Sequence, residues 1–413
     1  RDSSTSRGLG DVYKRQVSDD NENFTQIYAN DKIEFHRLCT FDTVKARYVK
    51  LTVEKSDNLP KIREMEIYNA VPEKKNDFRV STYSTLGGSV FGIIDDTTLS
   101  DAEKDAKIKE LIDADYYDTV TDYIDIGNVR WDEEGIIHTD GWDGIERDED
   151  KYYAVMMRNL HEVLDEKGVN LVITILNPSG ENGNQRVMKS ITENRDTLIT
   201  NMIAFANKYE FDGIDLDWEF PLSQDEFDAY NSFLQELKAR MKTEMWNKED
   251  ATLSLALATW ALKYTPETIE CIDYVNVMGY DILDQDGQHS SFFSSCVQAA
   301  DYIEIQGFSK EQINIGFPFY GTWEGGRMEQ YAYNAISEEI SPFNNFYTMK
   351  KSDTKEDRYT YFNSQAIIRD KTAYAYLKGY GGVMIFSQYC DLPSDDERSL
   401  TKAISDYLQE VTK

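Results

Sequence analysis

Four carboxylic acids fall within eight consecutive residues of the segment 211–221, which reads Phe-Asp-Gly-Ile-Asp-Leu-Asp-Trp-Glu-Phe-Pro. They are Asp212, Asp215, Asp217 and Glu219. Side chains on a β-strand alternate between its two faces, so the last three acids would form one row with steps of roughly 6.6 Å. The opposite face would be apolar, formed by Ile214, Leu216 and Trp218. Because buried acids are unfavourable unless the protein pairs or uses them, this row predicts a catalytic site rather than a solvated edge strand.

The spacing Asp-x-x-Asp-x-Asp-x-Glu and the Trp-Glu-Phe-Pro ending resemble the signature of glycoside hydrolase family 18, the chitinase-like family. This resemblance implies that the N-acetyl oxygen of the substrate, rather than a second carboxylate, attacks the anomeric carbon. It implies Glu219 as the general acid and later the base, with retention of the anomeric configuration. Asp217 would hold and polarise the acetamido group, and the deeper Asp215 would share a proton with it. Asp212 belongs to the motif as a structural position.

A second match is Met278-Gly-Tyr280-Asp281, which resembles the Met-x-Tyr-Asp motif of the family. The resemblance implies that the Tyr280 hydroxyl donates to the acetamido oxygen and holds the nucleophile in place. Asp281 would bind the reacting sugar, and Met278 would line the same subsite. Tyr83 is expected to support Asp215, although a one-residue slip of its strand would reverse its face.

Three aromatic residues are candidates for sugar contacts. Tyr320 closes a segment that resembles the seventh strand of the family and is expected to line the cleft. Trp323 could stack on a sugar face or serve packing, and the sequence leaves both roles open. Phe386 stands where the family usually has a tryptophan beneath the sugar. Phenylalanine keeps a stacking plane but lacks the indole N–H donor.

A further departure from the family lies after the third strand. The family commonly reads Ser-x-Gly-Gly there, often followed by Trp, whereas residues 174–180 read Thr-Ile-Leu-Asn-Pro-Ser-Gly. Thr174 can still offer its hydroxyl to Asp215. This departure and the Phe386 replacement therefore bear on specificity for crystalline chitin rather than on the chemistry.

Strand-like and helix-like patterns alternate from Phe78 onward, which predicts an α/β fold, a (β/α)8 TIM barrel. The predicted barrel strands are residues 79–83, 122–128, 170–176, 213–219, 252–258, 274–278, 313–317 and 382–386. Apolar residues at helical spacing predict packing helices between them, for example along 227–241. Active sites of such barrels gather at the carboxyl ends of the strands, where the candidate residues fall. The connection 321–378 is expected to hold at most a small insertion beside the cleft.

The first 77 residues are expected to be separate from the barrel, which would cover residues 78–413. Residues 1–16 resemble a translated sequencing adaptor and are expected to form no regular structure. Residues 17–70 alternate in hydropathy, most clearly at 41–53 and 62–68, and resemble the C-terminal half of a discoidin-type jelly roll, a small all-β fragment. Residues 71–77 would form the linker.

The composition restricts the partners. The 44 Lys and Arg residues against 75 Asp and Glu residues give a net charge of −31, which disfavours nucleic acid and anionic membranes. The four cysteines and four histidines show no ligand spacing, so we expect free thiols, no metal and no cofactor. No apolar run approaches the roughly 18 residues of a membrane span. We expect a monomer, secreted or at the cell surface, as the family resemblance implies.

Three functions are compatible with these residues. A chitinase acting on β-1,4-linked N-acetylglucosamine is the leading hypothesis. The same reaction on the chitobiose core of N-glycans or on peptidoglycan is the alternative, because the usual tryptophans are replaced. A chitinase-like lectin, which binds without cutting, usually lacks the final acid of the motif, and here Glu219 is present.

Overall fold

The chain, seen here in a computed structural model, divides into two compact units, Arg1–Lys74 and Lys75–Lys413. The structure describes residues 12–30, 44–55, 77–113, 118–140, 147–282, 291–323, 326–336, 346–350 and 357–412, together with residues 39, 41, 62, 65, 67 and 145. The division falls within the predicted linker at 71–77.

The first unit contains an antiparallel sheet of three strands in the order β2-β1-β3. The strands are β1 (Val12–Ser18), β2 (Thr25–Asn30) and β3 (Tyr48–Lys55). The prediction that residues 1–16 form no regular structure is wrong for residues 12–16, which pair with β3 and, from Tyr13 onward, with β2. Tyr13 is fully buried, and its burial helps to hold this central strand in place.

Other predictions for this unit are met in part. The strand predicted at 41–53 begins only at Tyr48. The strand predicted at 62–68 lies mostly outside the described residues. The discoidin-type resemblance stays a prediction.

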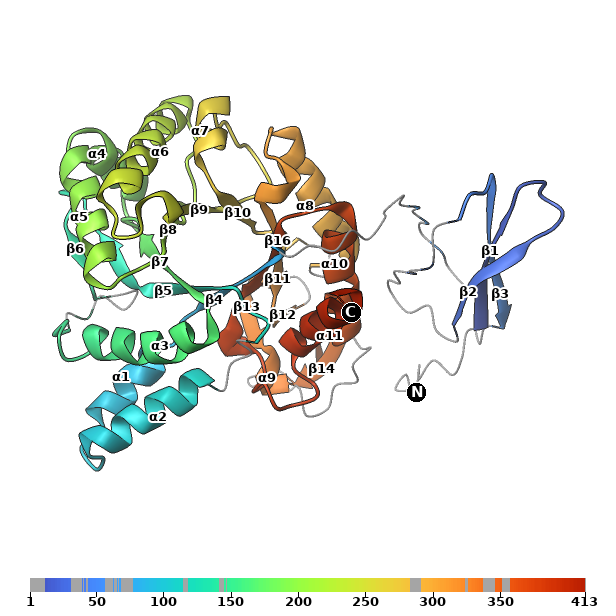
Figure 1. The fold of residues 1–413 in the computed structure, drawn as a ribbon, viewed down its shortest axis with the longest axis horizontal. Coiled ribbons are helices and arrows are strands. Elements are labelled where there is room, and N and C mark those ends of the chain that lie inside the picture. The colour runs from blue at the N-terminus through green and yellow to red at the C-terminus, as the bar shows by residue number, and fades with distance from the viewer. Residues whose placement is uncertain are drawn as a thin grey trace. The chain divides into compact units, whose positions relative to one another are not determined.

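Eight parallel strands form a closed barrel in the second unit, because β4 pairs with both β16 and β5 (Figure 1). The strands are β4 (Arg79–Ser84), β5 (Asp122–Trp131), β7 (Asn170–Leu176), β8 (Gly213–Leu216), β9 (Thr252–Leu257), β10 (Tyr274–Val277), β11 (Ile313–Pro318) and β16 (Gly382–Phe386). A short strand, β6 (Ile137–His138), pairs antiparallel with the end of β5. The predicted (β/α)8 barrel is confirmed, and each of the eight predicted strands overlaps an observed one.

Helices surround the barrel (Figure 1). They are α1 (Gly87–Asp95), α2 (Asp101–Asp113), α3 (Tyr153–Lys167), α4 (Gly183–Thr192), α5 (Arg195–Lys208), α6 (Gln224–Glu244), α7 (Pro266–Cys271), α8 (Phe293–Ile305), α10 (Gln365–Lys378) and α11 (Leu400–Thr412). Helix α6 begins with a capping box between Ser223 and Glu226 and buries its predicted apolar stripe, including Phe227 and Met241. Within the described part of the chain, no helix is long and apolar enough to cross a bilayer. The same part contains no disulfide.

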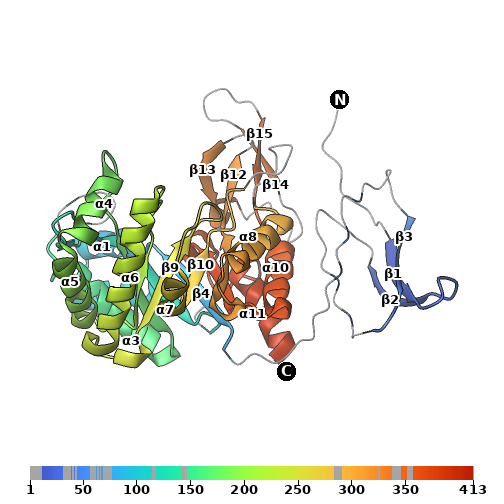
Figure 2. The same ribbon diagram turned by 90° about the horizontal axis from the view of Figure 1, so that it is seen from above.

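An inserted sheet lies between β11 and α10 along the chain. Its strands are β12 (Tyr320–Trp323), β13 (Gly326–Ala332), β14 (Phe346–Lys350) and β15 (Asp357–Tyr361), in the antiparallel order β13-β12-β15-β14, with the short α9 (Tyr333–Ile336) after β13. Figure 2 shows this sheet standing at one end of the barrel unit. The predicted small insertion is therefore a four-stranded sheet.

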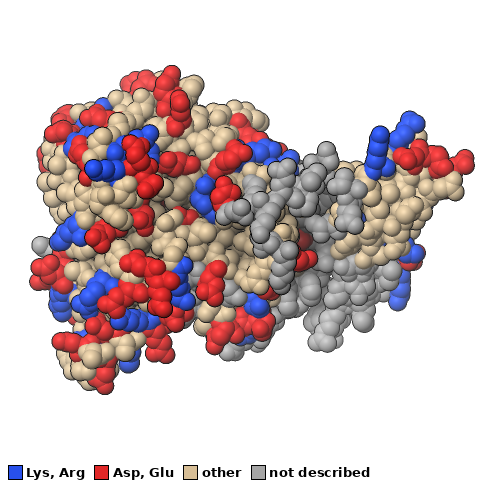
Figure 3. Space-filling model, viewed as in Figure 1, with Lys and Arg blue, Asp and Glu red and all other residues tan. Residues whose placement is uncertain are grey.

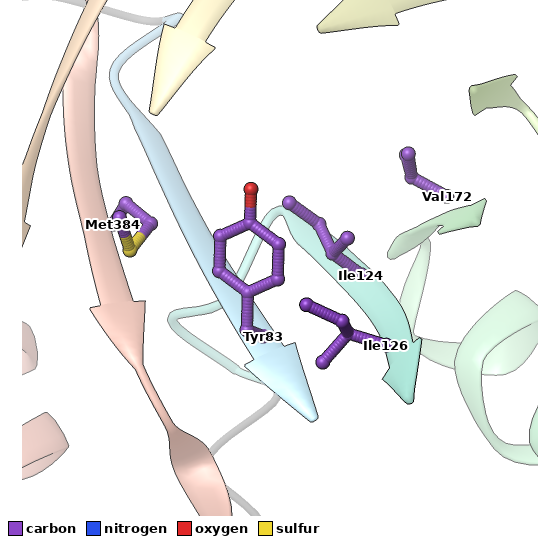
Figure 4. Packing of buried hydrophobic residues seen from close by; sticks show 5 residues of the cluster. All are labelled: Tyr83, Ile124, Ile126, Val172 and Met384. Atoms are coloured by element: carbon purple, nitrogen blue, oxygen red, sulfur yellow. The ribbon is translucent and has the colours of Figure 1, made fainter. Parts of the chain in front are cut away.

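The barrel interior has an apolar side. Tyr83, Ile124, Ile126, Val172 and Met384 form one buried cluster contributed by β4, β5, β7 and β16 (Figure 4). Leu176, Tyr280 and Phe386 pack against it and are only partly buried. Polar side chains occupy other positions of the interior, and these include the candidate site.

The surface carries the acidic excess of the sequence. On the face of the barrel unit drawn in Figure 3, Asp and Glu side chains are spread among Lys and Arg side chains over most of the helical layer. The ion pairs on this layer, such as Arg240 with Glu244 and Arg158 with Asp105, connect neighbouring turns and helices.

Candidate active site

Asp215 lies on β8 inside the barrel and is fully buried. Three hydroxyl groups donate to its carboxylate: Tyr83 at 3.0 Å, Thr174 at 2.8 Å and Ser254 at 2.6 Å. Thr174 and Ser254 reach it because β7 and β9 flank β8 in a register that sets both residues directly opposite Asp215. Burial raises the pKa of Asp215, and these hydrogen bonds work against that rise.

The strand that carries the acids is shorter than predicted. β8 ends at Leu216, so Asp217 and Glu219 lie in the loop that follows rather than on a strand extending to residue 219. The ladder with β7 stops at Asp215 and the ladder with β9 stops at Leu216, which leaves the backbone beyond without a strand partner. Both acids therefore sit where the barrel opens.

The alternation predicted for this segment nevertheless persists past the end of the strand. Leu216 and Trp218 are both buried on the opposite face. The Trp218 indole donates to Asn184 Oδ1 at 3.1 Å, and Asn184 Nδ2 donates to the Phe220 carbonyl at 3.0 Å. Asn184, on α4, therefore holds the chain immediately before and immediately after Glu219.

The electrostatics of the two loop acids differ from those of surface carboxyls. Burial raises the pKa of Asp217 well above its usual range, and the negative charges of Glu219 and Asp215 raise it further. Partial burial also raises the pKa of Glu219, and the negative charge of Asp281 raises it further. Asp217 Oδ1 is buried, and within the described residues it has no hydrogen-bond partner. The two acids are thus suited to keep a proton at a pH at which ordinary carboxyls have lost it.

Tyr280 lies among these carboxylates, three residues after the end of β10. Burial raises the pKa of its hydroxyl well above 10, and the charges of Asp217 and other nearby acids add to this effect. Gly316 on β11 leaves the space for its ring, because a Cβ there would lie 2.9 Å from Tyr280 Cε1. The hydroxyl is therefore a proton-bearing donor at neutral pH.

Asp281 follows Tyr280 with a φ of 57°, a left-handed conformation that aspartate tolerates better than most residues. Its carboxylate accepts a hydrogen bond from the Tyr320 hydroxyl at 3.0 Å, and its backbone N–H donates to Ser291 Oγ at 2.9 Å. Tyr320 opens the inserted sheet, so this contact connects the insertion to the site.

Phe386 ends β16 and belongs to a cluster of aromatic rings. Its ring stacks on that of Tyr280 with centroids 5.9 Å apart and an interplanar angle of 12°. Tyr83 and Tyr320 meet it edge to face, at 5.9 Å and 6.3 Å. Phe386 is only partly buried, so part of it remains open toward the mouth. The Phe386–Ser387 and Glu219–Phe220 peptide bonds are both cis.

The structure does not bring every candidate to this cluster. Asp212 lies at the other end of β8, where its carboxylate accepts from the Leu171 backbone N–H at 2.8 Å. Met278 follows β10 directly and is half-buried. Trp323 ends β12, but its side chain lies outside the described part of the structure. Tyr83 faces inward, so the one-residue slip considered for its strand does not occur.

Four residues near the site were not predicted as parts of it: Asn184, Ser254, Trp260 and Asn276. Ser254 and Asn276 are polar residues in largely apolar strands, whereas Thr174 was found by comparison with the family sequence at the end of the third strand. Trp260 follows β9, is 46% exposed, and its ring lies 4.8 Å from that of Phe220, the neighbour of Glu219. The sequence pattern does not distinguish Trp260 from a tryptophan that serves packing. The exposure of its ring in the structure makes this distinction.

Solved structures of similar fold are chitinases. The chain resembles a chitinase from Bacteroides thetaiotaomicron with a TM-score of 0.58 and 19% identity, over 81% of this chain and 97% of that one. It resembles the family 18 chitinase ChiB of Flavobacterium johnsoniae with a TM-score of 0.59 and 20% identity, over 82% and 96%. At these identities the likeness shows the fold.

Several relatives in sequence are also named chitinases. Chitinase A1 of Niallia circulans is 27% identical over 269 residues, which cover 50% of this chain and 38% of that protein. A class V chitinase of Arabidopsis thaliana is 26% identical over 196 residues, covering 41% and 52%. The chain spans between 9% and 55% of the length of the curated relatives compared.

The model of one family, glycosyl hydrolases family 18, matches residues 148–391. This match covers more than half of the chain and includes both motifs of the site, from Asp215 to Asp281. The chain belongs to glycoside hydrolase family 18.

Proposed function

We propose that this protein hydrolyses β-1,4-linked N-acetylglucosamine glycans with retention of configuration, using the acetamido group of the substrate as the nucleophile. The observation that carries the proposal is the single row of acids that runs from the buried Asp215 to Glu219 at the barrel mouth, with Tyr280 beside it. The family membership supports the reaction class.

Glu219 is the general acid in this proposal. Its raised pKa favours a carboxyl that still carries a proton when the substrate binds, and its place in the loop exposes it to the glycosidic oxygen. Once the leaving sugar departs, the same carboxylate takes a proton from the incoming water. General acid–base catalysis of this kind contributes about 10²–10⁴-fold in rate.

Asp217 and Tyr280 orient the acetamido group. The buried Asp217 Oδ1 would accept the acetamido N–H, which gives this oxygen a partner when substrate is present. The Tyr280 hydroxyl would donate to the acetamido oxygen and hold it below the anomeric carbon. As positive charge develops on the resulting oxazolinium, the carboxylate of Asp217 stabilises it.

Asp215 controls the proton on Asp217. Two carboxylates in one buried site cannot comfortably both ionise, so the pair would share one proton. Three hydroxyl donors favour the negative charge on Asp215, which leaves the proton to Asp217 in the free enzyme. When the substrate arrives, Asp217 would pass this proton to Asp215 and present its own charge to the acetamido group.

Chitin or its oligomers are the proposed substrate, since several relatives and structural neighbours are named chitinases. The chitobiose core of N-glycans or peptidoglycan is the second candidate, favoured by Phe386 in place of tryptophan and by the absence of the Gly-Gly sequence after β7. Because these polymers lie outside cells, we propose a secreted or cell-surface location. We also propose that the protein acts as a monomer.

A product profile tests this proposal. The protein should be incubated in parallel with chitin oligosaccharides, a high-mannose glycoprotein and peptidoglycan, alongside the matched variant Glu219→Gln. We expect cleavage of chitin oligosaccharides by the wild type and a loss of at least about 100-fold in the variant. Cleavage of the glycoprotein alone would favour the second candidate, and equal activity of the variant would contradict the role of Glu219.

A further inference from the structure

A chain of hydrogen bonds crosses the barrel interior and ends at Asp215. Arg79, the first residue of β4, donates from Nε to Asn314 Oδ1 at 3.1 Å. Asn314 donates from Nδ2 to Asn276 Oδ1 at 3.1 Å. Asn276 donates from Nδ2 to the Tyr83 hydroxyl at 3.1 Å, and this hydroxyl donates to Asp215 Oδ2 at 3.0 Å. Every bond in the chain runs in the same direction, from the amino ends of the strands toward the acid.

Arg79 fixes that direction. An arginine side chain carries only donors, so Asn314 must turn its carbonyl oxygen toward Arg79 and its NH₂ group toward the interior. Asn276 must then face Asn314 with its carbonyl and Tyr83 with its NH₂. Because the Tyr83 oxygen already accepts from Asn276, its own hydrogen is directed to the carboxylate of Asp215.

The backbone is shaped to admit this chain. A Cβ at Gly382, the first residue of β16, would lie 2.8 Å from Asn314 Oδ1, and one at Gly381 would lie 2.3 Å from a guanidinium nitrogen of Arg79. The Arg79 guanidinium also lies over the Tyr274 ring, with 4.9 Å between its central carbon and the ring centroid. The Arg79 side chain therefore has a defined position, and Gly381 and Gly382 leave the space that it and Asn314 occupy.

We propose that Arg79 is a remote positioning residue of the active site, which acts through Asn314 and Asn276 to direct the Tyr83 hydrogen at Asp215 and so holds this acid in its anionic form. The inference rests on the proposed function, in which Asp215 and Asp217 share a proton. Without Arg79 the Asn314 amide is no longer oriented by a donor-only group, because its other partner, the Ser81 hydroxyl, can donate as well as accept. A flipped Asn314 would present its carbonyl to Asn276 and favour a flip of that amide too, against the hydrogen bond that Asn276 makes toward Asp215. The Tyr83 hydrogen then turns toward an amide carbonyl, and Asp215 loses one of its three hydroxyl donors.

The tyrosines near Asp215 do not change charge in the working range of pH. Burial raises the pKa of each nearby tyrosine well above 10, and these are Tyr83 on β4, Tyr230 on α6, Tyr274 on β10 and Tyr280 after β10. Asp217 is the carboxyl whose charge acts together with that of Asp215. A change in the acidic limb of the rate profile therefore reports on this pair, because Glu219 must carry its proton and so sets the basic limb.

The experiment measures kcat/KM against pH on a fluorogenic N,N′-diacetylchitobioside for the full chain and its variants. Arg79→Met should move the acidic limb to higher pH by roughly half to one unit, because a carboxylate that loses a donor binds its proton more tightly. Asn314→Leu should produce the same shift, and the double variant should add nothing further. Arg79→Lys, which keeps a charged donor, should show a smaller shift.

Gln312→Met is the matched control. Gln312 lies two residues before Asn314 and donates to the carbonyls of Ile269 and Ile272 at 2.8 Å and 2.7 Å, outside the chain of bonds. This variant should lower thermal stability and leave the acidic limb in place. If Arg79→Met fails to fold, Asn314→Leu and Arg79→Lys carry the same test.

An unmoved acidic limb in the folded Arg79 and Asn314 variants of an active enzyme would overturn the inference. So would a shift of equal size in Gln312→Met, since it would show a general response to lost stability. A wild type that cleaves no acetylated substrate would contradict the proposed function instead, and with it the premise of this inference.

Discussion

At the scale of single residues, substitutions at Phe386 test whether its ring supports the bound sugar. Its ring stacks on Tyr280 and is partly open, so we expect it to support both the substrate and the Tyr280 hydroxyl. Phe386→Ala should lower kcat/KM on chitin oligomers by roughly two- to tenfold, because one aromatic pair is worth about 0.5–1.5 kcal/mol beyond its burial. Phe386→Trp should be tolerated.

Phe386→Leu is the control for this change, since leucine fills space without offering a flat ring. It should behave like the alanine variant in substrate affinity but lose less stability. Steady-state kinetics that show full activity for both leucine and alanine would place the sugar elsewhere in the cleft.

Trp260 is the second residue that can be tested singly. Its ring is half-exposed beside Phe220 at the mouth, and an exposed indole suits the apolar face of a sugar. Trp260→Ala should raise KM for long oligomers several-fold, by roughly the 1 kcal/mol of one aromatic contact, and affect a disaccharide substrate less.

Trp246→Ala is the matched variant. Trp246 is exposed to a similar extent, but it donates to the Phe211 carbonyl just before β8, at the opposite end of the barrel. Oligomer kinetics should be unchanged in this variant. A KM that rises equally in both variants would remove Trp260 from the binding surface.

The sequence could identify residues whose chemical type is unusual for their place. Asp215 stands out as an acid in an apolar strand, and Thr174 was found by comparison with the family sequence; their hydrogen bond is present in the structure. Ser254 and Asn276 are also polar in largely apolar strands, but only the structure links them to one acid: Ser254 lies opposite Asp215, and Asn276 donates to Tyr83, which donates to Asp215. The direction set by Arg79 depends on side-chain geometry that no spacing encodes.

At the scale of elements, strand positions were predictable because a buried parallel strand is a short apolar run between helical patterns. The end of β8 was not, because Asp217 and Trp218 continue the alternation after pairing has stopped. Burial pattern and hydrogen-bonded ladder are different properties, and alternation in sequence reports the first.

Asp125 gives a test of how β5 is held against α3. It is fully buried, accepts from Tyr153 at 2.8 Å and from Asn128 at 2.6 Å, and burial raises its pKa to about 7. A raised carboxyl pKa means that the folded state binds the proton more tightly. The neutral Asp125 carboxyl therefore stabilises the folded state fully below about pH 4, and this stabilisation is lost as the pH rises through about 7.

Asp125→Asn should remove this pH dependence. Between pH 4 and pH 8, the free energy of unfolding of the variant relative to the wild type should rise by roughly 2–4 kcal/mol, measured by urea denaturation. Asp395→Asn, at an exposed carboxyl, serves as the control and should show a much smaller change. Equal pH dependence of wild type and Asp125→Asn would show that the carboxyl is charged in the folded protein.

At the scale of the whole molecule, the alternation of strands and helices predicted the barrel, and the family match agrees with it. The size of the inserted sheet was not predicted, because its strands are short and pair with one another. The segments that connect these strands have the sequence pattern of loops. The strand at residues 12–16 was missed because the segment was set aside on its resemblance to an adaptor. Because β1 pairs with strands on both sides, residues 12–16 form part of a sheet in spite of that resemblance.

The central claim is that the acetamido group of the substrate is the nucleophile, and its most direct test is a pair of matched substrates. Initial rates should be measured on a fluorogenic chitobioside whose cleaved sugar carries either an N-acetyl or an N-trifluoroacetyl group. The two groups have similar shape, but fluorine withdraws electron density from the attacking oxygen. We predict a steep fall in kcat with the fluorinated substrate, while KM changes little. Equal rates on both would contradict substrate-assisted catalysis.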